Sequence, residues 1–367
     1  MGICISEIMK SKWILLAIFL FILLTQFKNL LSFIGIEIGV YYGFDKLDKN
    51  LNGLVEKKEW PEGSFSLVDF DRDGHITKQE FREFIKEFSS EFSWENNPNE
   101  KYDLPRQLVK GSFVSDSMGI RVGYFIYIPE SYRKQQDRKF RTVYYLHGGR
   151  PGNEAREVFI SSYLHKLLDS SLNPALYVFV NGGELSHYNS EDLNSYGENI
   201  FINELIPHID KKYRTIPDRF ARGLEGFSQG GRGATRYMFK YPELFGTVSA
   251  GGGSYMIEKL IQESKGYEDD PRDSSEDIFF VGKGNDTWTL AKKHKDSGKK
   301  TPKLLLWSGD RDMNFESIKK YATYLKDLEI DYSLLIAEGV DHNSFAFYEV
   351  KGEDLFRFHE EGYLNAQ

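Results

Sequence analysis

From about residue 105 onward, short apolar runs alternate with longer stretches in which apolar positions recur every three or four residues. The short runs are rich in branched and aromatic residues and predict buried strands, whereas the longer stretches predict amphipathic helices. We expect strands over 121–128, 142–146, 176–180, 303–307 and 332–336. We expect helices over 198–212, 231–240 and 315–328. Such alternation is typical of a mostly parallel sheet with helices on both faces.

The N-terminus has a different pattern, an unbroken apolar run from Trp13 to Leu24 that follows two lysines. The run has 12 residues, fewer than the roughly 20 of a membrane-spanning helix, and it has the length of a signal-peptide core. Further apolar residues as far as Ile34 extend it toward a retained anchor. We assign residues 1–34 to a signal peptide or signal anchor. The protein is therefore expected to be exported, as a periplasmic, secreted or membrane-anchored protein.

The first residues also allow a second interpretation. The opening Met-Gly-Ile-Cys-Ile-Ser fits the pattern for myristoylation of Gly2, with Cys4 available for palmitoylation. Met9, followed by Lys-Ser-Lys-Trp, is itself a natural opening of a signal peptide and an alternative start. We favour the export signal over lipidation.

Two twelve-residue segments near residues 48 and 69 share one spacing of oxygen-bearing side chains. In both, Asp or Asn stands at positions 1, 3 and 5, Gly at position 6 and Glu at position 12, which is the pattern of an EF-hand calcium loop. The ligands expected in the first loop are Asp48, Asn50, Asn52, the backbone carbonyl of Leu54, and Glu59. Those expected in the second are Asp69, Asp71, Asp73, the backbone carbonyl of His75, and Glu80.

Because the two loops lie in tandem, we expect a Ca²⁺-binding EF-hand pair over 36–92, with Val55 and Ile76 paired in the ribbon that joins them. Calcium is plentiful outside the cell, so we favour a structural ion over a calcium sensor. The polar, aperiodic stretch 93–104 is expected to be a linker. The α/β domain then occupies 105–360.

Composition excludes several classes of function. The chain has 47 Lys+Arg against 55 Asp+Glu, a net charge of −8, so we expect no nucleic-acid partner. Its one cysteine, Cys4, excludes an intramolecular disulfide and a cysteine-based metal site. Apolar residues make up 40% of the chain, which suffices for an ordinary globular core.

The candidate chemistry begins at Gly226-Phe-Ser228-Gln-Gly230, a Gly-x-Ser-x-Gly elbow between the strand-like stretch 220–224 and a helix. A serine hydroxyl attacks a carbonyl only when a base accepts its proton and an acid orients that base. The histidines downstream are His294, His342 and His359. His294 lies in a lysine run and His359 in a charged, helix-like stretch. His342 follows the strand 332–336 in a loop, where this fold places the base, and we choose it.

The acid is expected after the strand 303–307, where Asp310 and Asp312 both follow in Trp307-Ser-Gly-Asp-Arg-Asp312. Either carboxylate suits the role from its position alone. The aspartate that is not catalytic is expected to cap the helix that follows.

Residues 105–350 resemble one esterase branch of the α/β-hydrolases, which includes feruloyl esterases, acetylxylan esterases, esterase D and enterochelin esterase. The resemblance rests on four motifs: Tyr144-Tyr-Leu-His-Gly-Gly149, Asn203-Glu-Leu-Ile-Pro-His-Ile-Asp-Lys-Lys-Tyr-Arg-Thr215, Gly226-Phe-Ser-Gln-Gly-Gly231 and Tyr241-Pro-Glu-Leu-Phe245. It implies an α/β-hydrolase fold, here preceded by a small α-helical EF-hand pair. The family's acid stands in a Gly-x-x-Asp pattern, which selects Asp312 and leaves Asp310 in reserve.

The oxyanion of the tetrahedral intermediate needs two donors. We expect the backbone N–H of Gln229 and, from the loop after the strand 142–146, that of Gly149. His147 resembles the family's structural histidine and is not taken as a base. Tyr188 and the loop 181–183 lie where the family lines its substrate cleft. Glu225 departs from the family, which has a small residue there, and is expected to need a local partner.

The combined prediction is an exported serine carboxylic-ester hydrolase that removes acetyl or feruloyl groups from carbohydrate esters, with no cofactor for catalysis. The polar stretch 254–300 is expected to be a surface insertion or lid that influences substrate choice. Two alternatives remain: a siderophore-ester or thioester hydrolase with the same triad, and a non-enzymatic calcium-dependent binding protein on a hydrolase fold. The predicted binding partners are an acylated carbohydrate or another small ester as substrate and, if residues 1–34 are retained as an anchor, a membrane.

Overall fold

The structure of the protein is a computed structural model that describes residues 44–59, 68–69, 73–82, 92–98, 102–149, 152–168, 171–268 and 279–365. The chain divides into two units, Met1–Glu91 and Phe92–Gln367. The signal segment predicted over 1–34 lies outside the described residues. In the ranges just given, no helix is long and apolar enough to cross a membrane.

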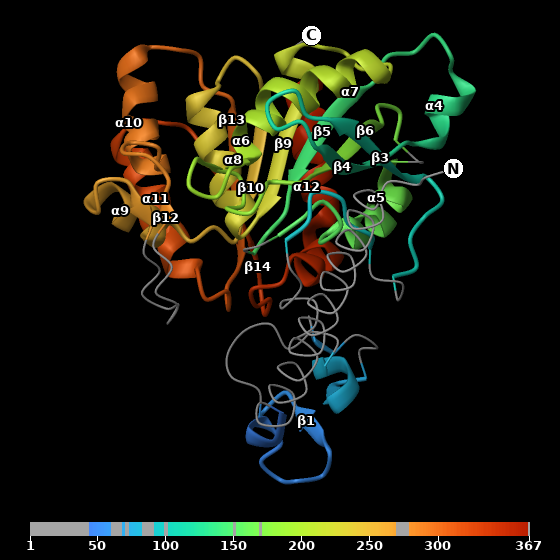
Figure 1. The fold of residues 1–367 in the computed structure, drawn as a ribbon, viewed down its shortest axis with the longest axis vertical. Coiled ribbons are helices and arrows are strands. Elements are labelled where there is room, and N and C mark those ends of the chain that lie inside the picture. The colour runs from blue at the N-terminus through green and yellow to red at the C-terminus, as the bar shows by residue number, and fades with distance from the viewer. Residues whose placement is uncertain are drawn as a thin grey trace, which may run out of the picture. The chain divides into compact units, whose positions relative to one another are not determined.

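The larger unit contains an eight-stranded sheet in the order β14-β13-β10-β9-β5-β6-β4-β3 (Figure 1). In chain order these strands are β3 (Leu108–Val114), β4 (Arg121–Tyr127), β5 (Arg141–Leu146), β6 (Ala175–Val180), β9 (Arg222–Phe227), β10 (Thr247–Gly251), β13 (Lys303–Gly309) and β14 (Ser333–Ala337). Neighbouring strands from β14 to β6 are parallel. At one side of the sheet, β4 pairs in antiparallel fashion with both β6 and β3.

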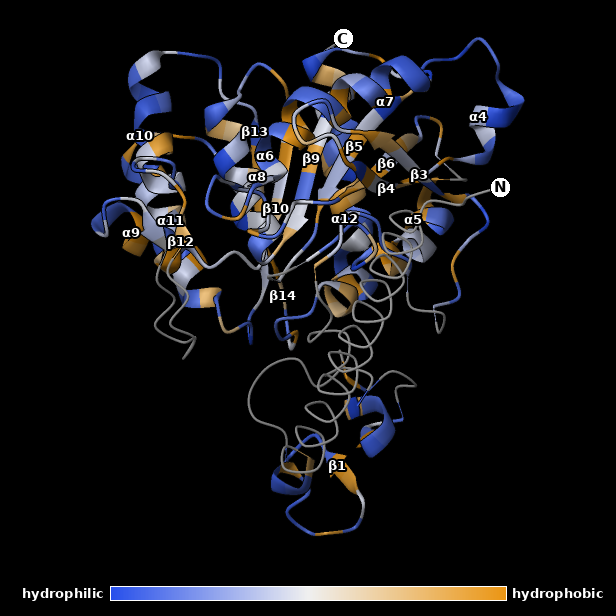
Figure 2. Cartoon of the chain, in the orientation of Figure 1, coloured by the Kyte–Doolittle hydropathy of each residue, from blue (hydrophilic) through white to orange (hydrophobic). Residues whose placement is uncertain are grey.

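Helices cover both faces of this sheet, because successive strand residues point to opposite sides. Tyr124 and Ile126 of β4 belong to a core that also holds buried residues of α7 (Ile206–Lys212), α8 (Gln229–Lys240) and α11 (Phe315–Asp327). Phe125 and Tyr127 belong to a second core with α5 (Ser161–Leu168) and α12 (Ser344–Leu364). Figure 2 shows hydrophobic residues along the central strands, whereas the outlying α4 (Glu130–Lys134) is largely hydrophilic.

The prediction of a mostly parallel sheet with helices on both faces is confirmed. The strand before the elbow, expected over 220–224, is β9 at Arg222–Phe227, because a short 3₁₀ turn occupies Arg219–Ala221. The helix expected over 198–212 has three parts. They are α6 (Gly197–Asn199), a π-helical turn at Ile200–Leu205, and α7.

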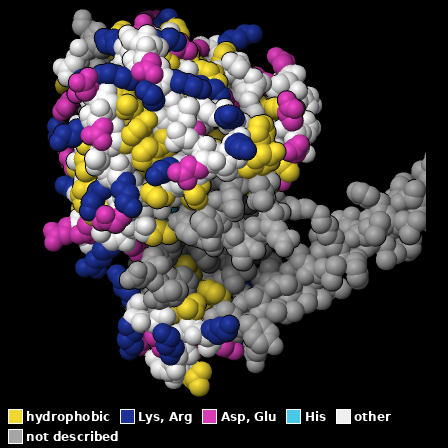
Figure 3. All heavy atoms as spheres, turned by 90° about the vertical axis from the view of Figure 1, so that its left-hand side faces the viewer, with side chains coloured by type: hydrophobic (Ala, Val, Ile, Leu, Met, Phe, Trp, Pro, Cys, Tyr) yellow, Lys and Arg dark blue, Asp and Glu magenta, His cyan; other side chains and the backbone are white. Residues whose placement is uncertain are grey.

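The stretch 254–300, expected to be a surface insertion or lid, is in part a component of the main core. This stretch contains α9 (Tyr255–Glu263), a hairpin of β11 (Tyr267–Glu268) and β12 (Phe279–Phe280), and α10 (Thr287–Ser297). Tyr255, Leu290 and Ala291 are buried in the main core. On the outer face of these helices, Lys and Arg side chains are interspersed with carboxylates (Figure 3). The charged composition of this stretch therefore describes its solvent side, while a few apolar residues attach it to the core.

The smaller unit contains a two-stranded antiparallel ribbon of β1 (Leu54–Glu56) and β2 (His75–Thr77). Val55 pairs with Ile76, as the spacing of the two loops predicted. Both residues lie in a small apolar core whose other buried members are Phe44, Val68 and Phe81.

The segment predicted as a linker is attached to the larger unit at its start. The backbone N–H of Asn96 donates to Glu154 at 2.7 Å, and the side-chain amide of Asn181 donates to the carbonyl of Ser93 at 3.1 Å. The carbonyl of Trp94 accepts from the N–H of Gly123 at 2.6 Å. Residues 93–96 thus lie against the α/β unit.

Candidate active site

Ser228 lies at a sharp turn between β9 and α8. Its backbone has φ 56° and ψ −117°, a conformation that is unusual for a residue with a side chain. The turn is possible because its neighbours are glycines: a Cβ on Gly226 would come within 2.4 Å of the carbonyl oxygen of Gly230, and one on Gly230 within 2.0 Å of that of Leu146. This is the strand–turn–helix context that the elbow motif requires, and it exposes the hydroxyl at the carboxyl end of β9.

His342 lies in the loop between β14 and α12, with its imidazole beside the serine. Its Nε2 is 3.0 Å from Oγ of Ser228, and its Nδ1 is 2.9 Å from each carboxylate oxygen of Asp312. A proton on Nδ1, donated to Asp312, leaves the Nε2 lone pair free to accept the serine proton. The ring of Phe227 packs against the imidazole at a centroid distance of 4.6 Å and restrains it.

The two candidate acids have different positions. Asp312 is buried, and its Oδ1 also accepts the N–H of Asn314 at 2.7 Å. Asp310 is exposed and accepts the N–H of Gly339 at 2.7 Å, in the loop that leads to His342. The expectation that the other aspartate, Asp310, caps the following helix is wrong. The residue at the N-cap of α11 is Asn314, and Asp310 binds the loop before His342 instead.

Of the two predicted oxyanion donors, Gln229 follows the serine directly and Gly149 lies in the loop after β5. Gln229 is the first residue of α8, so its N–H points out of the helix N-terminus. A Cβ on Gly148 would lie 3.2 Å from the Cβ of Ser228, which places this loop beside the nucleophile. The N–H of Gly148 donates to the carboxylate of Glu157. Among the described residues, the N–H groups of Gly149 and Gln229 have no protein acceptor.

His147 is buried behind this loop and is not near the serine's proton. Its Nδ1 donates to the carbonyl of Gly148 at 3.1 Å, and its Nε2 accepts the N–H of Gly182 at 3.0 Å. Burial, with a smaller contribution from the charge of Arg156, lowers the pKa of His147 to about 3. The imidazole is therefore neutral, and it binds backbone groups of Gly148 and Gly182.

Glu225, for which we expected a local partner, has two. Its carboxylate accepts hydrogen bonds from the hydroxyl of Tyr348 and, at 3.1 Å, from Nε2 of His359, both on α12. Nδ1 of His359 is in turn 2.7 Å from the hydroxyl of Thr247. The acid before the elbow thus connects β9 to the C-terminal helix.

Tyr188 does not line a cleft, contrary to the prediction from the family pattern. It is fully buried, its ring packs beneath the guanidinium of Arg236 at 3.6 Å, and its hydroxyl donates to Glu258. Asn181 of the neighbouring loop is also buried and donates to Glu154 at 2.7 Å. Both residues stabilise the loops around the site.

Sequence reasoning missed the residues that support this site from behind, above all Ser186, His187 and Arg236. Ser186 and His187 belong to no motif, and their positive φ angles of 45° and 77° are visible only in the structure. A signal existed for the arginines: Arg232 and Arg236 stand one turn apart on a helix whose inner face is otherwise small or apolar.

The two loops of the smaller unit have matching geometry. The N–H of Gly53 donates to Asp48 at 2.8 Å, and that of Gly74 donates to Asp69 at 3.1 Å. Both glycines have positive φ, at 83° and 87°. The first and last carboxylates of both loops are buried: Asp48, Glu59, Asp69 and Glu80.

The other predicted calcium ligands are described more fully in the first loop than in the second. Asn50 and Asn52 accept backbone N–H groups within their loop, and Glu59 accepts those of residues 49, 50 and 56. Asp73 and His75 begin the ribbon side of the second loop, whereas Asp71 lies outside the described residues. Among the residues described, no three His, Cys, Asp or Glu side chains converge as a metal-binding group, so a cation here would depend on amide and carbonyl oxygens too.

Comparison with known proteins gives one family and several structural neighbours. The model of a family described as "Putative esterase" matches residues 115–326. An endo-1,4-beta-xylanase/feruloyl esterase of Xylanibacter ruminicola is 27% identical over 163 residues, which are 41% of this chain and 22% of that protein. The chain spans no more than about a third of the length of the curated relatives it matches.

Two solved structures illustrate the shared fold. An S-formylglutathione hydrolase of Staphylococcus aureus is similar with a TM-score of 0.54 at 17% identity, covering 70% of this chain and 98% of the other. A ferulic acid esterase of Anaeromyces mucronatus, solved with ferulic acid, is similar with a TM-score of 0.53 at 17% identity, covering 74% and 98%. Both likenesses concern the α/β-hydrolase fold alone.

Proposed function

The chain belongs to this esterase family, and on that premise we propose that Ser228, His342 and Asp312 together hydrolyse a carboxylic ester. Membership supports the predicted class of enzyme, a serine carboxylic-ester hydrolase. The observation that supports these three residues most strongly is the contact at the elbow, 3.0 Å from Ser228 Oγ to His342 Nε2 and 2.9 Å from Nδ1 to Asp312.

The first half-reaction transfers the acyl group to the enzyme. Ser228 Oγ attacks the ester carbonyl while its proton passes to Nε2 of His342, and Asp312 stabilises the resulting imidazolium. The N–H groups of Gly149 and Gln229 bind the oxyanion of the tetrahedral intermediate. When this intermediate collapses, the alcohol leaves with the proton from Nε2 and the acyl group remains on Ser228.

The second half-reaction reverses the roles with water in place of the alcohol. His342 accepts a proton from water, and the hydroxide oxygen attacks the acyl carbonyl under the same two N–H donors. Collapse breaks the bond to Ser228 Oγ, which recovers its proton from Nε2, and a carboxylic acid is released. No cofactor takes part in these steps.

For the substrate we propose an acyl group, of the acetyl or feruloyl type, on a carbohydrate. The name of the relative in Xylanibacter ruminicola and the export segment predicted over 1–34 both support a polysaccharide-linked ester. A thioester or a siderophore ester could react at the same three residues, so the leaving group has to be determined by assay.

The experiment is a substrate panel with a nucleophile control. Purified full-length protein is assayed with para-nitrophenyl acetate, acetylated and feruloylated oligosaccharides, and a thioester, in parallel with Ser228→Ala. We expect turnover of the oligosaccharide esters that Ser228→Ala abolishes. A preference for the thioester would overturn the substrate, and inactivity of the wild type on every ester would overturn the hydrolase and favour a calcium-dependent binding protein.

For the smaller unit we propose a pair of calcium-binding loops of the EF-hand type. The ligands would be Asp48, Asn50, Asn52, the carbonyl of Leu54 and Glu59 in the first loop. In the second they would be Asp69, Asp71, Asp73, the carbonyl of His75 and Glu80. The all-oxygen donor set suits a hard cation, and the shared Gly-to-Asp hydrogen bond of both loops supports the pairing. A bound Ca²⁺ would neutralise the carboxylates of its loop and hold the ribbon together.

Thermal unfolding with and without calcium tests this proposal. We expect chelator to lower the melting temperature of the smaller unit in wild type, and the paired change Glu59→Gln with Glu80→Gln to remove the difference. Melting that does not respond to chelator would overturn the structural role. Turnover that depends on calcium at unchanged melting temperature would favour a sensor.

We also propose that residues 1–34 direct export and either are cleaved or anchor the protein in a membrane. Mass spectrometry of the N-terminus of the protein from its native cells tests this directly. We expect a start after the apolar run, or an intact run in the membrane fraction. An acylated Gly2 would overturn the export signal.

A further inference from the structure

Residues 186–188 form a strained turn behind the nucleophile. Ser186 and His187 adopt consecutive positive φ angles of 45° and 77°, which side-chain-bearing residues seldom do. Backbone hydrogen bonds fold this turn back on the preceding loop, from the N–H of Ser186 to Gly183 and from that of His187 to Gly182. Such strain persists only where surrounding contacts hold it.

We call residues 147–149 the oxyanion loop. Side chains of the turn bind backbone carbonyl groups of this loop. The hydroxyl of Ser186 donates to the carbonyl of Gly149 at 2.5 Å, and Nε2 of His187 donates to that of His147 at 2.9 Å. The carbonyl between them, on Gly148, accepts from Nδ1 of His147. Three consecutive carbonyls of this loop are therefore bound.

Because the peptide unit is planar and trans, its N–H points away from its carbonyl. Binding of the Gly148 carbonyl sets the direction of the Gly149 N–H, and binding of the Gly149 carbonyl holds the peptide plane on its other side. Gly149 has φ +72° and no side chain to restrain it. Without these contacts its N–H would be free to rotate away from the serine.

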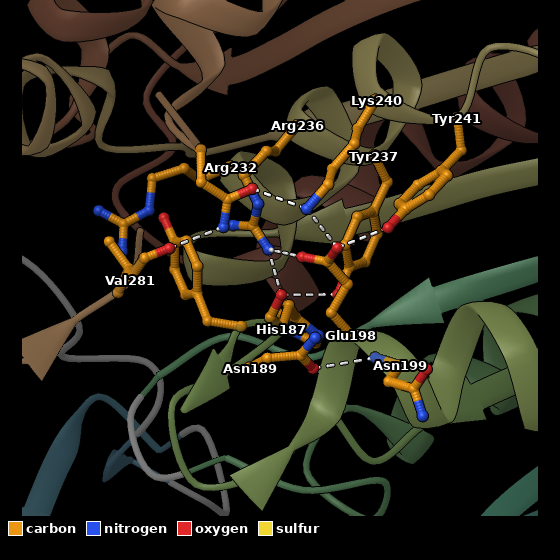
Figure 4. Close-up of polar contacts among 12 residues, drawn as sticks. His187, Asn189, Glu198, Asn199, Arg232, Arg236, Tyr237, Lys240, Tyr241 and Val281 are labelled. Atoms are coloured by element: carbon orange, nitrogen blue, oxygen red, sulfur yellow. Dashed lines mark hydrogen bonds and ion pairs between the residues drawn. The ribbon is translucent and has the colours of Figure 1, made fainter. Parts of the chain in front are cut away.

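The turn is itself held by helix α8, the helix that begins immediately after Ser228. As Figure 4 shows, a guanidinium nitrogen of Arg236 and the hydroxyl of Tyr237 converge on the carbonyl of His187, the latter at 2.6 Å. The guanidinium of Arg236 also stacks on Tyr188, the last residue of the turn. Nucleophile and turn are thus attached to one rigid element.

Buried acids compensate the charges on this face of α8. Glu198 lies 3.8 Å from Arg236 and accepts from Lys240 and, at 2.6 Å, from Tyr241 (Figure 4). Glu258 lies 3.1 Å from Arg232. Arg236 is fully buried, and burial of a charged guanidinium is costly unless such acidic partners are present. The guanidinium uses this buried position to bind the His187 carbonyl of the strained turn.

We propose that Ser186 is a positioning residue for the oxyanion donor Gly149, and that Arg236 and Tyr237 hold Ser186 in place through the carbonyl of His187. The inference rests on the proposed ester hydrolysis at Ser228. None of these side chains touches the reacting atoms; through the bond from Ser186 to the Gly149 carbonyl they restrain the peptide plane next to the N–H that would bind the negative charge developing on the substrate.

Ser186→Ala tests the contact directly, with Ser195→Ala as its matched control. Both serines are almost fully buried, and the hydroxyl of Ser195 accepts the N–H of Glu184 without touching the oxyanion loop. We expect Ser186→Ala to lower kcat about tenfold at unchanged KM, less than the roughly 10²- to 10³-fold loss of a whole oxyanion donor. Affinity for a tetrahedral phosphonate or boronate should fall by a similar factor, while Ser195→Ala retains wild-type kcat.

A comparison of Tyr237→Phe with Tyr241→Phe tests whether helix α8 holds the turn through the carbonyl of His187. Each change removes one hydroxyl with a 2.6 Å hydrogen bond, to His187 in the first case and to Glu198 in the second. We expect a several-fold loss of kcat only in Tyr237→Phe, with KM unchanged and melting temperatures of the two variants alike. Because Arg236 still binds the His187 carbonyl, the loss should be smaller than in Ser186→Ala.

The outcomes separate this inference from the function beneath it. If wild type hydrolyses no ester, the proposed function fails. If wild type is active and Ser186→Ala matches Ser195→Ala in kcat and in affinity for the tetrahedral inhibitor, the inference alone is overturned. A fall in kcat that accompanies an equal fall in folded fraction would likewise show a merely structural role.

Discussion

Among the described residues of the larger unit, two hydroxyl–imidazole–carboxylate chains have nearly equal geometry. In one, His342 lies 3.0 Å from Ser228 and 2.9 Å from Asp312. In the other, His359 lies 2.7 Å from the hydroxyl of Thr247 and 3.1 Å from Glu225. Judged by hydrogen bonds alone, both resemble a catalytic triad.

Their surroundings differ in every respect that matters for catalysis. Thr247 and Glu225 lie in neighbouring strands β10 and β9, and with His359 they are sealed in the core at 3%, 0% and 2% exposure. Ser228 instead is partly exposed on a strained turn, at the N-terminus of α8 and close to the loop that contains Gly148. A hydrogen-bonded triple becomes a site only where the backbone delivers the hydroxyl to substrate and supplies donors for developing charge.

The largest contrast is expected between the two hydroxyls. Ser228→Ala should lower kcat by roughly 10⁴- to 10⁶-fold, because it removes the nucleophile. Thr247→Val keeps the side-chain volume nearly unchanged and should leave kcat within about twofold while lowering the free energy of unfolding by about 1–2 kcal/mol. Steady-state kinetics and urea unfolding of both variants provide the measurement. Comparable catalytic losses in the two would refute the contrast.

The next effect concerns the two acids after β13. Asp312→Asn should lower kcat about 10⁴-fold, because an amide cannot stabilise the imidazolium and favours the wrong imidazole tautomer. Asp310→Asn retains an oxygen that can accept the N–H of Gly339, so kcat should change less than about threefold. Kinetics of the two variants under one set of conditions decide. Loss of turnover in Asp310→Asn alone would reverse the assignment.

Removal of the sealed acid should affect stability more than chemistry. Glu225→Ala leaves the hydroxyl of Tyr348 and Nε2 of His359 without their acceptor in the core, which should lower the free energy of unfolding by about 3 kcal/mol. The folded protein should retain kcat within about threefold. Denaturant unfolding, with kinetics corrected for the folded fraction, measures both quantities. Unchanged stability would show that the second triple is not needed for the fold.

The smallest effect is a pH dependence of stability that comes from the two neutral histidines behind the oxyanion loop. Burial lowers the pKa of His147 to about 3 and that of His187 well below its usual range. The unfolded chain therefore binds these protons first, and stability should be lost progressively as the pH falls below about 6.5.

Urea unfolding at pH 7, 6 and 5 tests this, with His187→Asn as the comparison. Asparagine tolerates positive φ and does not titrate, so its slope against pH should be lower than that of wild type by one proton. Stability of wild type that stays constant between pH 7 and 5 would contradict the neutral state of both histidines.

The sequence was sufficient for the architecture because local patterns determine it. Buried parallel strands are continuous apolar runs, and β5, β6 and β13 follow them to within a residue or two. The elbow and the loop containing His342 were predicted for a similar reason: each has a local motif or a place at the carboxyl end of a strand, which the fold requires. The choice of Asp312 over Asp310 needed the family pattern, since both follow the same strand.

What sequence reasoning missed depends on contacts between distant segments. The sequence assigns Tyr188 to a substrate cleft and His359 to a charged, helix-like stretch. In the structure both are core residues, because Arg236 packs on Tyr188 and Glu225 accepts a hydrogen bond from His359. The stretch 254–300 has a polar composition, yet Leu290 and Ala291 attach it to the core. In each case one buried partner outweighs the local composition.

The most direct test of the account is to identify the nucleophile chemically. The full chain is treated with an alkyl fluorophosphonate, and the adduct is located by mass spectrometry of its peptides. The account predicts one adduct, on Ser228, formed in step with loss of esterase activity, absent in Ser228→Ala and greatly slowed in His342→Ala. An adduct on another residue, or full inhibition with Ser228 unmodified, would contradict it.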